Sequence, residues 1–375
     1  MRQNSICKTL GFYYPSLKRR LFINYRDSLH KKQSIRLKNI LLEAPPFLNE
    51  FFIGIADTKT LLTKINYAYD LRNFFRYITT IDEFSHLSPD LFTLKDLDNI
   101  TTTHIENFLH YTSSYEKIYK TPLNKKTTIN RQNKERGKSR KLSSIRVMYS
   151  YFLKKQKVSQ NPALIVETPK LREKAITYLQ ADETARLIDT VEQGNSLTTS
   201  QKVYHKYTKN RDVAIVSLLL GTGIRLNECI GININHIDFK THTIKITRKG
   251  GNEAIIYFGD EVAEALLDYM EERKKATPAP NHEQALFLSM QNKRITERAV
   301  QNLVKKYSGI VSVKNISPHK LRSTYGTSLY KETGDIYIVA AALGHKDVNT
   351  TKKHYAHIDE ESLRASSKKI KLRKG

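Results

Sequence analysis

Several side chains in the second half of the chain could bind a phosphate group or attack it, and Arg225 is the first of them. Two glycines, Gly221 and Gly223, follow an apolar helical run that ends at Leu220. Because glycine tolerates the left-handed backbone of a helix end, we expect the chain to turn there and present Arg225 at the start of the next helix. A guanidinium held in this way can bind a phosphate. If Arg225 is considered alone, a surface ion pair with Glu228, three residues further along the helix, is the simpler explanation.

A histidine and a second arginine, His319 and Arg322, lie three residues apart on a predicted helix. Ser317 suits the N-cap of this helix, and Pro318 suits its first position. The apolar face is expected from residues spaced four apart, namely Leu321, Tyr325 and Leu329. His319 and Arg322 fall on another face, where they either approach one phosphate near the positive end of the helix dipole or simply face solvent.

Lys249 is expected at the tip of a β-hairpin. Apolar residues alternate through 244–246 and resume through 255–258, with Gly250-Gly251 between the two runs. A lysine at such a turn most often protects the sheet edge and keeps the protein soluble. In a phosphate site, the same ammonium could instead act as a proton donor.

His345 and Tyr355 form the last group of candidates. A helix of small residues ends at Gly344 and delivers His345 immediately after its end. We expect Asn349 to begin another short helix, which would carry Tyr355 ten residues beyond His345, close enough for the two to share a site. A tyrosine hydroxyl can serve as a covalent nucleophile. Taken alone, His345 is an ordinary loop residue and Tyr355 an ordinary half-buried aromatic.

Positioning these side chains requires folded domains, and a chain of 375 residues predicts two of them. We expect a basic arm over residues 1–42, a helical domain over 43–160 and a linker over 161–174. The remaining residues, 175–375, are expected to form an α+β domain that is mainly helical with a small antiparallel sheet.

The helical domain is predicted from three apolar stripes with helical spacing. Their residues are Ile65, Tyr69, Leu71, Phe74, Phe75 and Tyr77; Ile105, Phe108 and Leu109; and Leu142, Ile145, Met148, Tyr149 and Phe152. Asn161-Pro162 and Thr168-Pro169 then break the pattern and mark the linker. Acidic residues at 182–183 indicate the first helix of the second domain.

The charge of the chain predicts a polyanionic partner. Lysine and arginine outnumber the acidic residues 63 to 37, which gives a net charge of +26 and a pI near 9.8. Nucleic acid is the polyanion whose phosphates such a surface neutralises with release of counterions. No apolar run approaches the roughly 20 residues that span a bilayer, so a membrane partner is not expected. No signal-peptide pattern is visible, so we expect a cytoplasmic location. Cys7 and Cys229 are too few for a disulfide framework or a thiolate zinc site.

Two segments concentrate the basic charge. Residues 1–42 hold ten lysines or arginines, one acid and interleaved aromatics, which predicts either a solvated arm or an accessory contact with DNA or a partner. Residues 120–141 hold nine basic residues and one acid. We expect the second segment to be a loop or helix entrance that faces a polyanion, in preference to a solvated linker.

Taken together and in order, the motifs resemble those of the tyrosine recombinase family, also called phage integrases. The chain carries Thr222-Gly223-Ile224-Arg225, Arg248-Lys249-Gly250-Gly251, His319-Lys320-Leu321-Arg322, Leu343-Gly344-His345 and Tyr355-Ala356-His357. The strong resemblance covers about residues 175–365, and the branch it is most similar to is Xer-like, including the single-recombinase XerS type. The helical segment before it is similar to the core-binding (SAM-like) domain of the family by pattern alone.

The resemblance implies a site-specific recombinase that cuts and rejoins double-stranded DNA through a 3′-phosphotyrosine at Tyr355. The implied roles are charge stabilisation by Arg225 and Arg322, general base catalysis by His319, proton donation to the leaving oxygen by Lys249, and phosphate binding or tyrosine orientation by His345. It also implies that the reaction needs no metal, ATP or other cofactor. The expected assembly is a C-shaped clamp of two domains and a homotetramer on two duplexes, with a dimer on each site.

Two other functions use the same fold. A DNA-binding relative without catalysis would bind its site and form no covalent adduct. An enzyme similar to type IB topoisomerases would share the nucleophile and the arginines, yet relax DNA without exchanging strands. Among recombinases, DNA integration or excision and chromosome dimer resolution require the same chemistry, and the DNA target is not encoded in these motifs.

Overall fold

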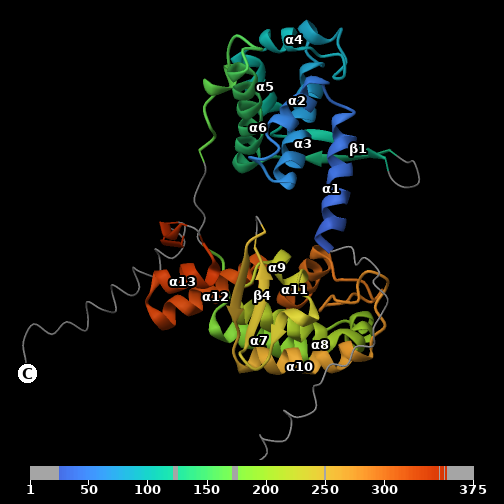
Figure 1. Ribbon diagram of the computed structural model, residues 1–375, viewed down its shortest axis with the longest axis vertical. Coiled ribbons are helices and arrows are strands. Elements are labelled where there is room, and N and C mark those ends of the chain that lie inside the picture. Colours follow the sequence, from blue (N-terminus) through green and yellow to red (C-terminus); the bar gives the residue numbers. More distant parts are fainter. Residues whose placement is uncertain are drawn as a thin grey trace, which may run out of the picture. The chain divides into compact units, whose positions relative to one another are not determined.

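The computed structural model describes residues 25–120, 126–170, 176–248, 251–345, 347–349 and 351–352. These fall into two compact units, one of residues up to 170 and the other of residues from 176 onward. The described elements are mainly helices, with one small three-stranded antiparallel sheet in the second unit and a hairpin in the first (Figure 1). This agrees with the fold class predicted from the sequence.

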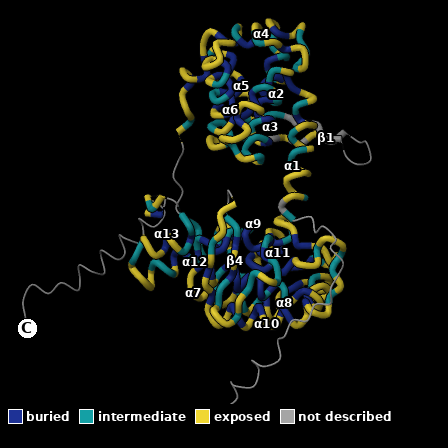
Figure 2. The backbone as a smooth tube through the Cα atoms, viewed as in Figure 1, coloured by how far each residue is buried: buried dark blue, intermediate teal, exposed yellow. Residues whose placement is uncertain are grey.

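The first unit packs its helices around one hydrophobic core (Figure 2). Its helices are α1 (Tyr25–Leu41), α2 (Phe47–Gly54), α3 (Leu61–Ile78), α4 (Leu94–Asp98), α5 (Thr102–Tyr111) and α6 (Glu135–Lys154), with single 3₁₀ turns at Asp82–Phe84 and Pro162–Leu164. The three predicted apolar stripes lie on α3, α5 and α6 and turn toward this core, where Phe74, Phe108 and Phe152 are fully buried. The prediction of these three helices is confirmed.

The structure differs from the prediction at the basic arm. Residues 25–41 of the expected arm form helix α1, which packs against α3. Ile40 is buried in the core, and Leu37 and Leu41 pack against it. Tertiary burial of these few apolar residues orders a helix whose own sequence is weakly amphipathic, so local composition gave little sign of it.

The basic segment 120–141 contains the entrance of a helix, as expected, but another part of it forms a strand. Strands β1 (Tyr115–Lys120) and β2 (Lys126–Arg131) pair antiparallel, and α6 then begins at Glu135. Three β-favouring residues in succession, Thr127, Thr128 and Ile129, account for a strand within a basic sequence.

The expected linker is packed over its first half. Ala163 and Val166 are buried in the core of the first unit. Arg146 on α6 holds their backbone, since its Nε donates to the carbonyl oxygen of Ala163 at 2.8 Å and its Nη2 donates to that of Val166. The helix α6 already ends at Lys154, before Pro162, and the chain after the proline remains packed on the domain that precedes it.

The second unit places helices around the three-stranded sheet. Its helices are α7 (Ala181–Gln193), α8 (Thr199–Thr222), α9 (Leu226–Ile230), α10 (Asp260–Lys275), α11 (Glu297–Val311), α12 (Pro318–Thr333) and α13 (Ile336–Leu343), with a 3₁₀ turn at Ile234–His236. The strands are β3 (Ile237–Asp238), β4 (Thr243–Thr247) and β5 (Glu253–Tyr257), in the order β3-β4-β5. Ile244 pairs with Ile256 across the predicted β4–β5 hairpin, and both are buried.

Gly221 does not form part of the turn that was predicted from the pair of glycines. It lies within α8, and a Cβ atom there would come within 2.4 Å of Cγ2 of Val262 on α10. Gly221 therefore permits close packing of two helices, while Gly223, with φ of 60°, alone makes the turn.

No helix among the described residues is long and apolar enough to cross a membrane.

Glu183 in the first turn of α7 supports a prediction about pH. Its carboxylate bonds Nζ of Lys314 at 2.5 Å and accepts from the backbone N–H of Gln180 at 2.8 Å. These bonds lower the pKa of Glu183 from 4.5 to about 2, and the bond to Lys314 has the largest effect. Because the folded pKa is the lower one, the stabilisation is complete above pH 4.5 and is lost as the pH falls toward 2.

We expect Glu183→Gln to lower the free energy of unfolding at pH 7 by about 1 kcal/mol and to flatten its decline in acid. Urea unfolding at a series of pH values measures both effects. Asp182→Asn is the matched control, because its exposed ion pair with Arg186 should contribute little. Parallel pH curves for wild type and Glu183→Gln would contradict the prediction.

Candidate active site

Arg225 lies where the sequence predicted, at the start of a helix that follows a glycine turn. It is the N-cap residue of α9, and its backbone N–H donates to Oε2 of Glu228 at 3.0 Å. Its side chain donates from Nη1 to Oε1 of Glu228 at 3.1 Å and from Nη2 to the carbonyl oxygen of Gly344 at 3.2 Å. The ion pair with Glu228 is therefore present, but it holds the guanidinium against a distant turn of the chain. The side chain remains 40% exposed, so a ligand can reach it.

Arg322 on α12 is buried and connects two turns of the second unit. Its Nη1 donates to the carbonyl oxygen of Gly223 at 2.5 Å, and its Nη2 donates to the carbonyl oxygen of Leu343. Only 6% of the residue is exposed, which excludes the alternative of a solvent-facing arginine. Gly223 precedes the loop to Arg225 and Leu343 precedes Gly344, so this one guanidinium fixes the backbone on both sides of the site.

His319 lies in the first turn of the same helix and is exposed. The helix begins at Pro318 as predicted, and Ser317 is its N-cap residue, although the Ser317 hydroxyl makes no capping hydrogen bond within the described chain. The apolar face is also as predicted: Leu321 is buried, and Tyr325 packs against the end of α8 at Gly223.

His345 follows the end of α13, where Gly344 adopts the left-handed conformation with φ of 60°. The backbone N–H of His345 donates to the carbonyl oxygen of Ala340 at 2.9 Å. Its ring Nδ1 lies 2.7 Å from Oγ1 of Thr351, a fully buried residue that the sequence had not singled out. The contact fixes the orientation of the imidazole ring, and residue type and spacing alone gave no sign of it.

The short helix predicted after His345 begins earlier than expected. Residues 348–349 and 351–352 are helical, so Asn349 lies inside the helix and does not cap it. Oδ1 of Asp347 instead accepts from the backbone N–H of Asn349 at 2.9 Å. Aspartate is as good a capping residue as asparagine, and it stands two positions earlier.

Lys249 and Tyr355 lie outside the described residues. The structure therefore brings together Arg225, Arg322 and the turn that carries His345, while the placement of the hairpin lysine and of the nucleophile stays a prediction.

Arg248 is a residue at this site that sequence reasoning did not propose. It follows β4, and its backbone N–H donates to the carbonyl oxygen of Asn252 at 2.7 Å. Its guanidinium lies against Gly344: a Cβ atom built on that glycine would be 2.0 Å from Nη1 and 2.2 Å from Cζ of Arg248. In the sequence it was visible only as the residue before Lys249.

Other nucleophiles near these residues are suppressed by burial. Desolvation raises the pKa of Cys229, on α9 beside Glu228, to about 12. Burial likewise raises the pKa of Tyr325, although Arg322 opposes that effect. Burial disfavours the anion that each group would have to form in order to attack phosphorus, so neither is favoured as the nucleophile.

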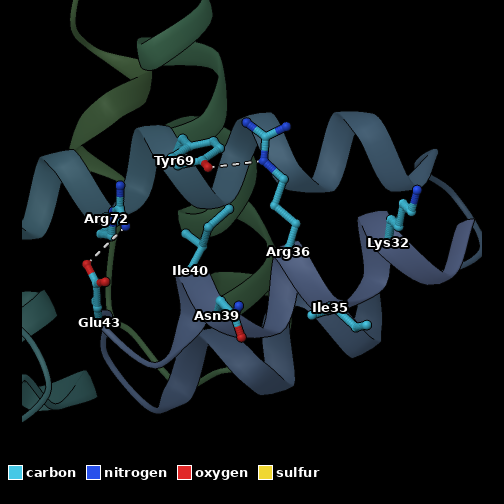
Figure 3. Close-up of a pocket in the computed structure, with 8 residues that line it drawn as sticks. All are labelled: Lys32, Ile35, Arg36, Asn39, Ile40, Glu43, Tyr69 and Arg72. Carbon is cyan, nitrogen blue, oxygen red and sulfur yellow. Dashed lines mark hydrogen bonds and ion pairs between the residues drawn. The ribbon is translucent and has the colours of Figure 1, made fainter. Parts of the chain in front are cut away.

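A separate pocket of about 350 Å³ lies in the first unit between α1 and α3 (Figure 3). Its lining residues are Lys32, Ile35, Arg36, Asn39, Ile40, Glu43, Tyr69 and Arg72. The guanidinium carbons of Arg36 and Arg72 each lie 5.1 Å from the centre of the Tyr69 ring, and Nε of Arg36 donates to the Tyr69 hydroxyl at 3.1 Å. Nη1 of Arg72 donates to Glu43 at 3.0 Å. These contacts attach α1 to α3, and the pocket holds none of the predicted site residues.

Comparison with known sequences matches residues 177–362 to the model described as the phage integrase family. The chain is similar to tyrosine recombinase XerC of Caldanaerobacter subterraneus subsp. tengcongensis, with 31% identity over 88% of each chain. It is also similar to tyrosine recombinase XerC of Chlorobaculum tepidum, with 27% identity over 85% of this chain and 92% of that one.

Two solved structures share the fold at low sequence identity. The XerH site-specific recombinase bound to palindromic difH substrate, a post-cleavage complex, has a TM-score of 0.61 at 20% identity and covers 90% of this chain and 88% of its own. The Tn1549 transposon integrase in complex with circular intermediate DNA has a TM-score of 0.59 at 18% identity and covers 85% of this chain and 97% of its own.

Proposed function

The chain belongs to the phage integrase family and is a site-specific tyrosine recombinase that acts on DNA, and on this premise we propose that one active site built around Arg225, Arg322 and Tyr355 carries the strand transfer. The proposed catalytic residues, in chain order, are Arg225, Lys249, His319, Arg322, His345 and Tyr355. The observation that carries the proposal is the convergence of Arg225 and Arg322 on the Leu343–Gly344 turn, directly before His345.

The arginines are proposed to neutralise the attacked phosphate. When a phosphodiester is attacked, negative charge collects on its non-bridging oxygens, and guanidinium groups held in place match that charge. Arg225 is exposed enough to donate directly. Arg322 contributes its charge from a buried position and holds both turns rigid, so the field is preorganised before DNA binds.

Cleavage is proposed to exchange one phosphorus–oxygen bond for another. The Tyr355 oxygen attacks phosphorus and passes its phenolic proton to His319, because a phenol with pKa near 10 needs a base at neutral pH. The bond from phosphorus to the 5′-oxygen breaks, and that oxygen takes a proton from Lys249. His345, oriented by Thr351, supplies a hydrogen bond to the phosphate or to the nucleophile.

Rejoining reverses the same exchange. The 3′-phosphotyrosine retains the energy of the broken bond, so a 5′-hydroxyl from another duplex can attack it and release Tyr355. No metal, nucleotide or other cofactor enters these steps. We propose a dimer on each recombination site and a homotetramer on two sites, since exchange between duplexes needs an active site for each cleaved strand.

Formation of a covalent adduct on nicked DNA tests this function. The site is first located by footprinting the purified protein on DNA from its own genome. A nick shortly 3′ of the cleaved phosphate then lets the short fragment that carries the new 5′-hydroxyl diffuse away. This traps the adduct, which is measured by denaturing electrophoresis. An adduct together with recombinant plasmid product supports the proposal. Relaxed plasmid without recombinants indicates a topoisomerase, and binding without an adduct indicates an inactive relative.

The position of the site in the genome assigns the biological role. A site opposite the replication origin supports chromosome dimer resolution. Attachment repeats that flank a mobile element support integration and excision. Both processes use the chemistry proposed above.

The basic segment of the first unit supports a prediction about DNA affinity. Lys134 and Arg136 are exposed, whereas Lys141 is buried beside Asp70, which also binds Arg140. We therefore propose that Lys134 and Arg136 contact DNA phosphates, and that Lys141 serves the fold.

We expect the double variant Lys134→Ala/Arg136→Ala to bind its site more weakly and to reduce the slope of log affinity against log salt by about 0.9 for each lost contact. Titrations at several salt concentrations measure the slope. The control is Lys274→Ala/Lys275→Ala on α10, which removes the same exposed charge elsewhere. Equal slopes for the two double variants would contradict a local contact.

A further inference from the structure

Three guanidinium groups gather on one two-residue segment of backbone. Arg322 donates to the carbonyl oxygen of Leu343, Arg225 donates to that of Gly344, and Arg248 lies against the α-carbon of Gly344. Glu228 balances one of these charges through its bond to Arg225. The segment thus carries more positive charge than the neighbouring carboxylate can offset, which is the electrostatic condition for binding an anion.

Arg248, which is half-buried, differs from the buried arginines of the same unit in the hydrogen bonds that its guanidinium makes. Arg273 donates to the carbonyl oxygens of Ala285 and Glu283, and Arg294 donates to backbone carbonyls and to a side chain. Nε of Arg248 is buried and has no hydrogen-bond partner within the part of the chain that the structure describes. Nε of Arg72 in the first unit is also buried without a partner, but the Arg72 guanidinium donates from Nη1 to Glu43. At Arg248 the unsatisfied donor coincides with an excess of positive charge around Gly344, and this combination favours an acceptor that comes with the substrate.

We propose that Arg248 is a third arginine of the strand-transfer site and donates a hydrogen bond to a non-bridging oxygen of the cleaved DNA phosphate. The inference rests on the proposed function, because it takes the phosphate to lie beside Arg225. Packing against Gly344 holds the guanidinium in place, while Nε makes no hydrogen bond within the described residues. The phosphate charge is then surrounded by arginines from three elements: Arg225 at the start of α9, Arg322 on α12 and Arg248 after the end of β4.

Methylphosphonate DNA distinguishes a charge contact from a structural role. In such DNA a methyl group replaces one non-bridging oxygen of the cleaved phosphate, which removes its negative charge. A residue that neutralises this charge matters less on the neutral substrate, whereas a residue that only supports the fold matters equally on both. The experiment uses the full chain and the nicked site described above, made with either group at the cleaved position.

We expect Arg248→Ala to form the adduct about 10²-fold more slowly than wild type on the phosphodiester, the loss typical of one stabilising donor. On the methylphosphonate the loss should shrink to within a few fold. Arg248→Gln, which keeps most of the side-chain volume, should behave in the same way. Arg298→Ala, an exposed arginine on α11, is the control for loss of charge and should match wild type on both substrates.

Two results would overturn the inference. If Arg248→Ala forms the adduct as fast as wild type on the phosphodiester, Arg248 does not contact the phosphate in the reaction. An equal loss on both substrates assigns Arg248 to the fold, and this comparison holds even if part of the variant is unfolded, because both substrates meet the same protein. Absence of an adduct with wild type would instead refute the proposed function.

Discussion

Tyr355→Phe is expected to abolish the covalent protein–DNA adduct while leaving DNA binding intact. The substitution removes only the hydroxyl oxygen that is proposed to attack phosphorus, and loss of a covalent nucleophile lowers rates by about 10⁴-fold or more. The ring remains, so packing and affinity should change little. Adduct yield on the nicked site measures the first effect, and a binding titration on the same DNA measures the second.

Tyr337→Phe is the matched control for this loss. Tyr337 lies on α13, is 70% exposed and has no role in the proposed mechanism, so its variant should form the adduct at the wild-type rate. The chain has 21 tyrosines, and several could be trapped if the nucleophile were not unique. An adduct that persists in Tyr355→Phe would show that another residue attacks the phosphate.

Gly344→Ala is expected to slow adduct formation by about 10²-fold, because misplacement of reacting groups by about 1 Å has effects of that size. The added methyl group would collide with the guanidinium of Arg248. It would also strain a backbone with φ of 60°. Since the carbonyl oxygen of Gly344 accepts from Arg225, displacement of this turn moves two arginines and His345 together.

Gly334→Ala separates the collision from the backbone strain. Gly334 ends α12 with φ of 65°, and a Cβ atom there would meet nothing within 4 Å. Both variants should lose about 1–2 kcal/mol of stability from the left-handed conformation, as measured by urea unfolding. Only Gly344→Ala should lose activity. A similar loss of activity in both variants would assign the effect to stability alone.

Local patterns in the sequence were sufficient for the elements that carry the arginines and His345. A glycine after an apolar helix predicted the turn before Arg225, a proline predicted the start of α12, and Gly344 predicted the end of α13. Each prediction is confirmed because the signal lies within a few residues of the feature that it determines. Predictions that ignored tertiary packing were wrong, as with the role of Gly221 in the α8–α10 contact.

In the first unit, too, local sequence patterns predicted some elements and missed those that depend on tertiary packing. Three apolar stripes predicted α3, α5 and α6 because each stripe is long and regular. Helix α1 and strand β2 were missed, since both lie in segments whose concentrated basic charge was interpreted as a contact with a polyanion or with solvent. Pairing with β1 and packing on α3 decide those structures, and a partner outside the segment leaves no periodic pattern in the segment itself.

The sequence by itself determined the family, the order of the candidate catalytic residues and the polyanionic partner, because residue type, spacing and net charge are properties of the chain before it folds. Only the tertiary structure decided which groups meet on the Leu343–Gly344 turn. It places Arg322 in a buried position between two turns, Thr351 against the ring of His345, and Arg248 against Gly344. These contacts join elements that are far apart in the chain, and they exist only because helices and sheet close around a common core.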